Sequence, residues 1–294
     1  MKKRKPQYNS RGENIAQCVI VAVLLLFAAS IVIPFFNVFA VSTSSKMAVI
    51  SGRVTVYPIG FNLDSYELVM QNTYFFRAYG NTIFVALVGT VISMTLTTMA
   101  AFIVSRRDLP GKTFITYAIT LTMWFSGGMI PSFLLIRELG LYDNLFALIL
   151  PGAISAYNVI VMRSFFKSLP DSLEESAMLD GANDIVILFR IYIPLSLPSI
   201  ATVTLWVVVG YWNAYTPALL YLSTRSKYTL QLVLREIVFN NTLAQYMDSP
   251  DTISVLSDSI IYANIILTIL PIMCIYPFLQ KYFVKGVMIG AVKG

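Results

Sequence analysis

Residues 14–45 read NIAQCVIVAVLLLFAASIVIPFFNVFAVSTSS and contain no charged side chain. A helix that rises about 1.5 Å per residue crosses roughly 30 Å of hydrocarbon with about 20 apolar residues, so this run can span a membrane. The basic residues 2–5 and the small residues near 38–40 resemble parts of a secretory signal peptide. The apolar run is, however, much longer than the roughly 7–15 residues of a signal peptide core. We therefore expect an uncleaved first transmembrane helix.

Five further charge-free runs follow along the chain, and the shortest holds 19 residues. They lie between Arg77 and Arg106, Lys112 and Arg137, Asp143 and Arg163, Arg190 and Arg225, and Asp258 and Lys281. Each is close to or above the length that a spanning helix needs. The sequence therefore predicts an all-α integral membrane protein with six transmembrane helices, centred near Leu25, Ile92, Trp124, Ile154, Val203 and Leu270.

Composition excludes several other classes of protein. Of the 294 residues, 57% are hydrophobic and 12% are charged, whereas soluble domains have about 45–50% apolar and about 25% charged residues. The net charge of +6 does not indicate nucleic-acid binding, because four of the basic residues fall at positions 2–5, beside the first apolar run. Histidine is absent and the two cysteines, Cys18 and Cys274, are far apart. Histidine-based catalysis, a zinc site and a disulfide framework are therefore not expected, and an enzyme is the least favoured class.

The distribution of Lys and Arg predicts the orientation. With a cytoplasmic N-terminus, 14 of the 21 basic residues fall in the inside segments, although the outside segments are longer in total. The positive-inside rule therefore favours an N-in, C-in topology. Residues 41–80 and 223–257 then lie outside. The second of these segments contains an amphipathic helix over residues 230–238, with Thr229 as its N-cap, which serves either for packing on the membrane or the bundle or as a docking surface for an external partner.

The sequence contains no energy source for transport. Gly111, Lys112 and Thr113 resemble the end of a phosphate-binding P-loop, but Arg106 stands where that motif needs its first glycine. Proton-coupled carriers usually require a charged residue within a span, but no charged residue lies in the middle of any predicted span here. Sodium coupling through backbone carbonyls remains an alternative. The energy for transport is therefore expected from another subunit.

The inside segment between the fourth and fifth spans is far longer than a simple turn. Pro170 ends any helix that continues from the fourth span, and Ser172 with Glu175 has the spacing of a capping box. We expect a short helix over residues 173–180 that stops at Gly181 in a left-handed conformation. Asn183 or Asp184 is expected to cap the next helix, which runs toward Pro194 and Pro198. The short helix either docks into a groove on another protein or packs on its own bundle, and its local pattern does not decide between the two.

The same segment carries a resemblance to a known family. Glu175, Ser176 and Ala177, then Gly181, then Ile191-x-Ile193-Pro194 match the spacing E-A-A-x3-G-x9-I-x-L-P, with Ser176 and Ile193 as conservative departures. This pattern resembles the signature of permease subunits in binding-protein-dependent ABC importers. The similarity extends over most of the chain and is greatest to the six-span carbohydrate permeases of the maltose-transporter type. Further similar stretches are Asn81-Thr82, 106–111, 127–131, Trp212-Asn213, 285–294 and, for a subgroup that handles complex oligosaccharides such as aldouronates, 228–236.

The resemblance implies a function and a set of partners. The chain would form a heterodimer with a second permease in a bacterial cytoplasmic membrane. Two ATPase subunits would use ATP and Mg, an extracytoplasmic solute-binding protein would deliver an oligosaccharide, and this chain would bind no cofactor, metal or nucleic acid. The loop helix would be the coupling helix that sits in a cleft of the ATPase. The matching docking positions are Glu175, Ser176, Ala177, Asp180 and Gly181.

The resemblance also implies how the chain is divided. A cytoplasmic basic tail covers residues 1–14, and the first span with its external segment covers residues 15–80. The permease core covers residues 81–282, with the coupling loop at 166–194 and the external loop at 223–257. A cytoplasmic tail, 283–294, follows, in which glycines recur every four residues and which is expected to reach the ATPase.

A sugar pathway needs aromatic faces for the rings and amides or hydroxyls for the OH groups. The candidates in the fourth and fifth spans are Tyr157, Asn158, Trp212, Asn213 and Tyr215. Aromatic residues near span ends also form interfacial belts, which is the competing explanation for Trp212 and Tyr215. Two other functions remain open, namely an ABC permease for peptides or amino acids and a self-sufficient ion-coupled carrier.

Overall fold

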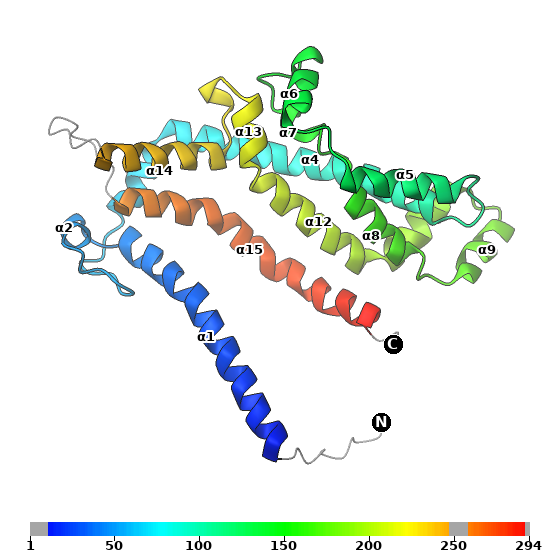
Figure 1. The fold of residues 1–294 in the computed structure, drawn as a ribbon, viewed down its shortest axis with the longest axis horizontal. Coiled ribbons are helices and arrows are strands. Elements are labelled where there is room, and N and C mark those ends of the chain that lie inside the picture. The colour runs from blue at the N-terminus through cyan, green and yellow to red at the C-terminus, as the bar shows by residue number, and fades with distance from the viewer. Residues whose placement is uncertain (1–10, 247–257, 292–294) are drawn as a thin grey trace. The chain divides into compact units, whose positions relative to one another are not determined.

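The structure is a computed structural model that describes residues 11–246 and 258–291, and within these ranges every regular element is a helix. The all-α prediction is therefore confirmed for the described part of the chain. The basic residues 2–5, on which part of the orientation argument depends, lie outside it. The chain divides into two compact units, and Figure 1 traces its helices by colour from the N-terminus to the C-terminus. Unit 1 takes its residues from 1–71 and 240–267, and unit 2 takes its residues from 72–239 and 268–294.

Among the residues that the structure describes, three helices are long and apolar enough to cross a membrane, namely Gly12–Ser42, Thr73–Ser105 and Asp258–Pro277. Two pairs of shorter helices also qualify if each pair counts as one span. Lys112–Trp124 and Met129–Glu138 meet at 108°, and Asp184–Leu195 and Leu197–Trp212 meet at 85°. The predicted fourth span corresponds to two shorter helices with an irregular segment between them. The structure therefore has long apolar helices at the predicted places, but several of them are broken.

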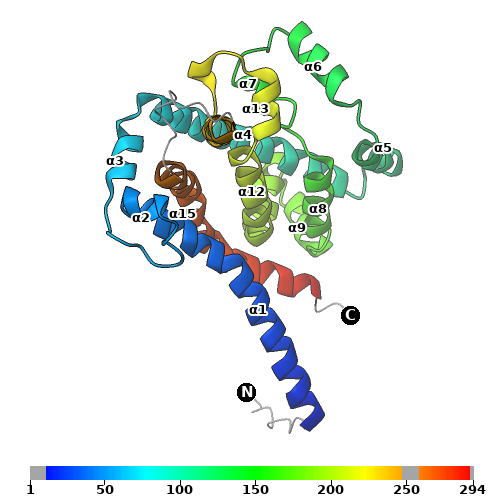
Figure 2. The same cartoon turned by 60° about the vertical axis from the view of Figure 1, so that its left-hand side comes forward.

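Unit 1 begins with a long helix whose most apolar part is not buried against protein. It contains α1, α2 and α3, which cover Arg11–Ser42, Lys46–Ile50 and Asp64–Gln71, and Figure 2 displays α2 and α3 near one end of α1. None of the most apolar window of α1 is buried against protein, so its side chains need a lipid environment. At the C-terminal end of α1, near α2 and α3, the Ser42 hydroxyl lies 2.8 Å from the Tyr66 hydroxyl. Ala40, Ala48 and Val54 form a small core there.

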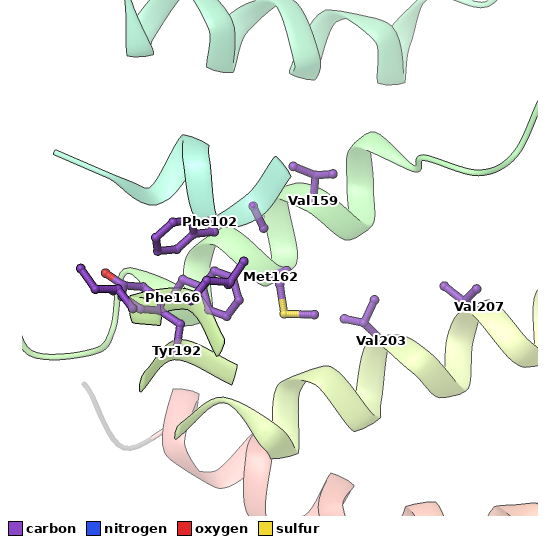
Figure 3. Close-up of a cluster of buried hydrophobic side chains, with 10 residues drawn as sticks. Phe102, Val159, Met162, Phe166, Tyr192, Val203 and Val207 are labelled. Atoms are coloured by element: carbon purple, nitrogen blue, oxygen red, sulfur yellow. The ribbon is translucent and has the colours of Figure 1, made fainter. Parts of the chain in front are cut away.

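Unit 2 is built around three helices, α4, α8 and α12, which pack against one another (Figure 3). Their buried side chains include Phe102 from α4, Met162 and Phe166 from α8, and Val203 from α12. The buried residues of this set are called the core cluster below: Ala101, Phe102, Val159, Met162, Phe166, Ile187, Leu188, Tyr192, Val203 and Val207.

The helices up to α9 are α4 Thr73–Ser105, α5 Lys112–Trp124, α6 Met129–Glu138, α7 Phe146–Ile149, α8 Ala156–Phe166 and α9 Asp171–Leu179. The later elements are α10 Asp184–Ile187, η1 Leu188–Tyr192, α11 Ile193–Leu195, α12 Leu197–Trp212, α13 Tyr215–Tyr221, η2 Arg225–Lys227, α14 Leu230–Tyr246 and α15 Asp258–Ala291. Residues 240–246 of α14 and 258–267 of α15 belong to unit 1.

A glycine sets the distance between α4 and α12. A Cβ atom at Gly89 would lie only 2.8 Å from the ring of Tyr211. The Tyr211 hydroxyl donates a hydrogen bond of 3.2 Å to the carbonyl of Ile149, which limits how far the ring can move. Small residues at such positions let membrane helices approach closely. Gly89 therefore lets α4, α12 and the end of α7 pack together.

The start of α14 is capped by another helix rather than by its own preceding residue. The predicted amphipathic helix is present, with Leu230, Leu232 and Val233 buried. Thr229 stands at the cap position, but its buried hydroxyl has no hydrogen-bond partner in the described structure, so the prediction that it caps α14 is wrong. The hydroxyl of Thr82 on α4 instead accepts the N–H of Leu230 at 2.7 Å. This bond between helices fixes where α14 begins.

The carboxylate of Asp143 joins two segments that are predicted to lie outside the membrane. Asp143 adopts a left-handed backbone conformation with φ 57°. Its carboxylate accepts the N–H groups of Ser223 and Thr224 at 3.0 and 2.9 Å, and Lys227 binds it at 2.7 Å. Burial opposes ionisation of this carboxyl, but these hydrogen bonds prevail and hold the pKa of Asp143 well below its ordinary value. The bonds tie the α6–α7 connection to the segment that leads into α14.

We expect Asp143→Asn to lower the thermal stability of unit 2 by a few degrees, because it removes the charge from Lys227 while it keeps a side chain suited to a left-handed backbone. A depressed carboxyl pKa stabilises the fold above the unfolded pKa, near 3.8, and this contribution is lost as the pH falls through the lower folded value. The difference in melting temperature should therefore stay constant from neutral pH down to about pH 4. Glu138→Gln, at an exposed carboxylate nearby, is the control and should change nothing. An equal melting temperature for Asp143→Asn and the native protein would show that the ion pair of Asp143 with Lys227 does not stabilise unit 2.

Candidate functional site

The loop helix α9 begins two residues earlier than the capping pattern predicts. It covers Asp171–Leu179, and Pro170 occupies the N-cap position, where no side chain makes a capping hydrogen bond. The predicted capping box of Ser172 and Glu175 is therefore wrong. The reason is local, since a capping box needs its serine at the N-cap, whereas Ser172 is the second residue inside the helix and Pro170 occupies the cap. The prediction that Pro170 separates this helix from α8 is confirmed, because α8 ends at Phe166.

The end of α9 is a complete Schellman motif at the predicted glycine. Gly181 has φ +80°. The N–H of Ala182 donates to the carbonyl of Ala177 at 2.9 Å, and the N–H of Gly181 donates to that of Met178 at 3.0 Å. These two bonds satisfy carbonyls that the end of the helix leaves open. The prediction of a left-handed stop at Gly181 is thus confirmed.

The segment after the Schellman motif returns to the bundle through an irregular helix. The side chain of Asn183 accepts the N–H of Val186 at 2.9 Å, which confirms the predicted cap. The helix then passes through a π turn over Leu188–Tyr192 and bends by 85° before α12. π turns are rare and occur mostly at functional sites. This turn determines where the ring of Tyr192 enters the core cluster.

The predicted docking positions form an exposed surface on α9. No residue of α9 is buried in the chain. Glu175, Ser176, Asp180 and Gly181 are exposed, and Ala177 is half-buried because it packs against the core cluster. Leu179 is 89% exposed, which leaves a large apolar side chain without a protein partner beside acidic groups. Such a surface suits a partner with an apolar pocket and basic residues.

Two carboxylates of α9 pair with the arginines that follow α4. Glu174 lies 3.1 Å from the guanidinium of Arg106, at the end of α4, and it accepts a hydrogen bond of 2.5 Å from the hydroxyl of Tyr192. Arg106 also pairs with Asp184 at 2.9 Å. A second, more exposed ion pair joins Arg107 to Asp171. In Figure 1, α9 lies near the end of α4 where these two arginines follow.

A groove of about 280 Å³ opens between α4, α8, α12 and α13 in unit 2. Its lining combines aromatic and polar side chains, including Ser93, Asn158, Trp206 and Tyr211. Asn158 is only 9% exposed, and within the described residues its amide group makes no hydrogen bond. The ring of Tyr157 lies 5.9 Å from that of Trp206. An uncommitted amide beside an aromatic pair is the combination that sugar recognition requires.

The five predicted pathway residues take different roles in the structure. Asn158 lines the groove, and Tyr157 packs on Trp206 beside it. Trp212 is 5% exposed, and its indole N–H donates to the carbonyl of Thr268 at 3.1 Å, so its only donor is already used. Asn213 accepts a hydrogen bond of 3.1 Å from Gln231, and the ring of Tyr215 lies under the guanidinium of Arg235 at 5.4 Å. Asn213 and Tyr215 hold α14, and of the five residues only Asn158 lines the groove itself.

Trp206 and Tyr211 line the groove but are not among the five predicted pathway residues. Trp206 lies in the middle of a charge-free run, away from the span ends where tryptophan forms interfacial belts. A tryptophan at that position indicates a role inside the bundle rather than at the membrane interface. Tyr211 carries no signal of its own, because its role depends on the close approach that Gly89 allows.

Comparison with known proteins identifies the family. The model of the binding-protein-dependent transport system inner membrane component matches residues 7–289. The chain belongs to this family. The permease is 41% identical over 282 residues to the polygalacturonan/rhamnogalacturonan transport system permease protein YtcP of Bacillus subtilis, a match that covers 94% of this chain and 97% of YtcP. It is 36% identical to protein LplC of the same organism, with 98% of each chain covered.

A solved structure also resembles the permease closely. A chain of a bacterial ABC transporter that imports the acidic polysaccharide alginate superimposes with a TM-score of 0.85 at 35% identity, covering 94% of this permease and 99% of that chain. A more distant relative, 26% identical, is the arabinooligosaccharides transport system permease protein AraQ of Halalkalibacterium halodurans, with 90% of this chain and 91% of AraQ covered. YtcP and AraQ are thus named as permeases of polysaccharide or oligosaccharide transport systems, and the solved structure belongs to a transporter involved in polysaccharide import.

We expect Gly181→Val to abolish transport by the permease while the protein still inserts into the membrane. A Cβ at this position meets no atom within 4 Å, so the cost comes from the backbone, at roughly 1–3 kcal/mol for a branched residue held at positive φ. Gly181→Asn is the matched control, because asparagine tolerates the left-handed region. Uptake and membrane content should be measured for both variants. Uptake by Gly181→Val equal to that of Gly181→Asn would show that the Schellman stop is dispensable.

Proposed function

We propose that this permease is one half of the translocation pathway of an ATP-driven importer for oligosaccharides. It pairs with a second permease, and two cytoplasmic ATPase subunits use ATP and Mg to drive it. A solute-binding protein outside the membrane delivers the cargo. The observation that carries the proposal is α9, a capped helix with every position unburied and with the family's coupling residues on its surface.

The mechanism is alternating access driven through α9. Closure of the ATPase pair around ATP draws the two coupling helices of the permease pair together. α9 is suited to this role because it is held at both ends, by Pro170 and by the Schellman motif at Gly181, yet presents Leu179 and Glu175 outward. Its displacement moves α4, α8 and α12, which open the pathway to one side of the membrane at a time.

The cargo is proposed to be an oligosaccharide that contains uronic acid units. Two close relatives support this class, since one is named for polygalacturonan and rhamnogalacturonan and the other imports the acidic polysaccharide alginate. The groove offers an aromatic pair and an amide but no charged side chain. It is therefore suited to a sugar ring, and the carboxylates would be met by the second permease.

Two alternatives have less support. A permease for peptides or amino acids would keep the coupling helix, but the relatives with stated cargo are named for sugars. An ion-coupled carrier would need no ATPase and no exposed docking helix. The exposed apolar end of α9 favours the ABC mechanism over such a carrier.

Reconstitution tests the mechanism directly. We expect liposomes that contain the full complex to accumulate trigalacturonate only with internal ATP and the binding protein present. The permease alone, with a sodium or proton gradient, should accumulate nothing. Uptake by the permease alone would establish an ion-coupled carrier. Uptake of a tripeptide in place of trigalacturonate, under otherwise equal conditions, would reassign the cargo.

The groove predicts a specific effect of Trp206→Ala. Because Trp206 offers the ring face that Tyr157 supports, its loss should reduce uptake about tenfold or more while ATP hydrolysis continues. Tyr215→Phe is the matched control, since it alters an aromatic residue of the same region that packs on Arg235 rather than lining the groove. Uptake should be measured over a range of trigalacturonate concentrations. Unchanged uptake by Trp206→Ala would remove the groove from the pathway.

A further inference from the structure

Tyr192 is the one hydroxyl-bearing side chain of the core cluster, and it joins that cluster to α9. Its ring packs edge-to-face against Phe102 at 5.0 Å and against Phe166 at 5.3 Å, so it contacts both α4 and α8. Its hydroxyl oxygen lies at the edge of the cluster in Figure 3. There it donates the 2.5 Å hydrogen bond to Glu174. A single residue therefore contacts two helices of the bundle and the loop helix.

Both oxygens of Glu174 are occupied by groups from the bundle. Oε1 pairs with Arg106, and Oε2 accepts from Tyr192. The side chains of Glu174 and Arg106 are only 17% and 16% exposed, so water screens this pair less than it screens the exposed pair of Arg107 and Asp171. The guanidinium of Arg106 also lies over the ring of Phe102, 5.6 Å from its centre. The three groups thus form a closed polar joint that rests on the core cluster.

The remaining attachments of α9 are few. Within the described residues, none of its side chains is buried, and the apolar contribution to the core cluster comes from the half-buried Ala177 with Leu169 and Ala182 on either side. Small apolar contacts of this kind are weak and non-directional. Hydrogen bonds to a charged group are stronger and fix the direction of the contact as well as its distance. The joint is therefore the stiffest connection between α9 and the bundle.

We infer that Glu174, Arg106 and Tyr192 form a joint that transmits the displacement of α9 to α4 and α8, with Tyr192 as a positioning residue for transport rather than a contact for sugar or ATPase. The inference rests on the proposed coupling role of α9. The surrounding π turn supports it, because the wider turn sets the register at which the Tyr192 ring faces inward while its hydroxyl reaches Glu174. Loss of the joint should leave α9 free to bind and follow the ATPase while the bundle no longer follows α9.

Tyr192→Phe tests the joint with the least disturbance, because it removes one oxygen and keeps the ring that packs on Phe102 and Phe166. The purified full complex is reconstituted with Cys18 and Cys274 replaced by serine and one cysteine placed at Ala214, which lines the groove. An impermeant maleimide reports the exposure of that cysteine, with and without ATP and vanadate. In the native background we expect trapping to change the labelling rate. In Tyr192→Phe we expect ATP hydrolysis to persist and the change in labelling rate to fall about tenfold, as for loss of one hydrogen bond to a charged group.

Asp171→Asn is the matched control, because it breaks an exposed ion pair on the same helix and should leave the labelling response unchanged. A double-mutant cycle with Glu174→Ala separates the joint from simple packing. If the two residues act through their shared bond, Tyr192→Phe has no further effect once Glu174 is alanine. Additive effects, or a native response in Tyr192→Phe, overturn the inference. If ATP and vanadate do not change the labelling rate of the native complex, the proposed function is overturned instead. The failure of the joint and the failure of the proposed function are therefore distinguishable.

Discussion

A nine-residue helix with no buried side chain cannot hold its shape alone, since isolated helices shorter than about 12–15 residues are marginal in water. The proposed coupling role depends on how this constraint is met in α9. Pro170 fixes its start, the two Schellman hydrogen bonds at Gly181 fix its end, and Glu174 fixes its orientation to the bundle. Apart from Ala177, which packs on the core cluster, and Asp171, which pairs with Arg107, the helix can thus present its remaining side chains to a partner.

The bilayer explains why the bundle around α9 is irregular. In hydrocarbon every backbone polar group must be satisfied within the protein, so broken helices are tolerated only where protein or a water-filled cavity surrounds the break. The break before α12 follows this rule, since it lies in the segment that carries Tyr192 and rests on the core cluster. On the side predicted to face outward, the hydroxyl of Thr82 satisfies the first N–H of α14 in the same way. The irregular backbone is therefore located where side chains of neighbouring helices can complete its hydrogen bonds.

Local signals in the sequence predicted what depends on neighbouring residues and missed what depends on distant ones. The left-handed stop at Gly181 and the cap by Asn183 each need only residues within one turn, and both are confirmed. The capping box at Ser172 failed because the helix began at Asp171, a shift too small for a pattern to resolve. The ion pair of Arg106 with Glu174 joins residues 68 positions apart, and no sequence spacing encodes it. For the pathway, amide and aromatic content identified Asn158, whereas the burial of Trp212 against Thr268 follows only from tertiary packing.

The core cluster connects the two functional parts of unit 2. Val207 belongs to the cluster and also lines the groove, while Val159 of the cluster follows Asn158 directly on α8. Because protein interiors are packed as densely as organic crystals, a displacement applied at Tyr192 cannot be absorbed by empty space in the cluster. It must instead appear as a movement of α4, α8 or α12, the helices that form the walls of the groove. The distance between the polar joint and the side chains that line the groove is thus spanned by close-packed side chains, which is what the proposed importer, driven from outside its own chain, requires.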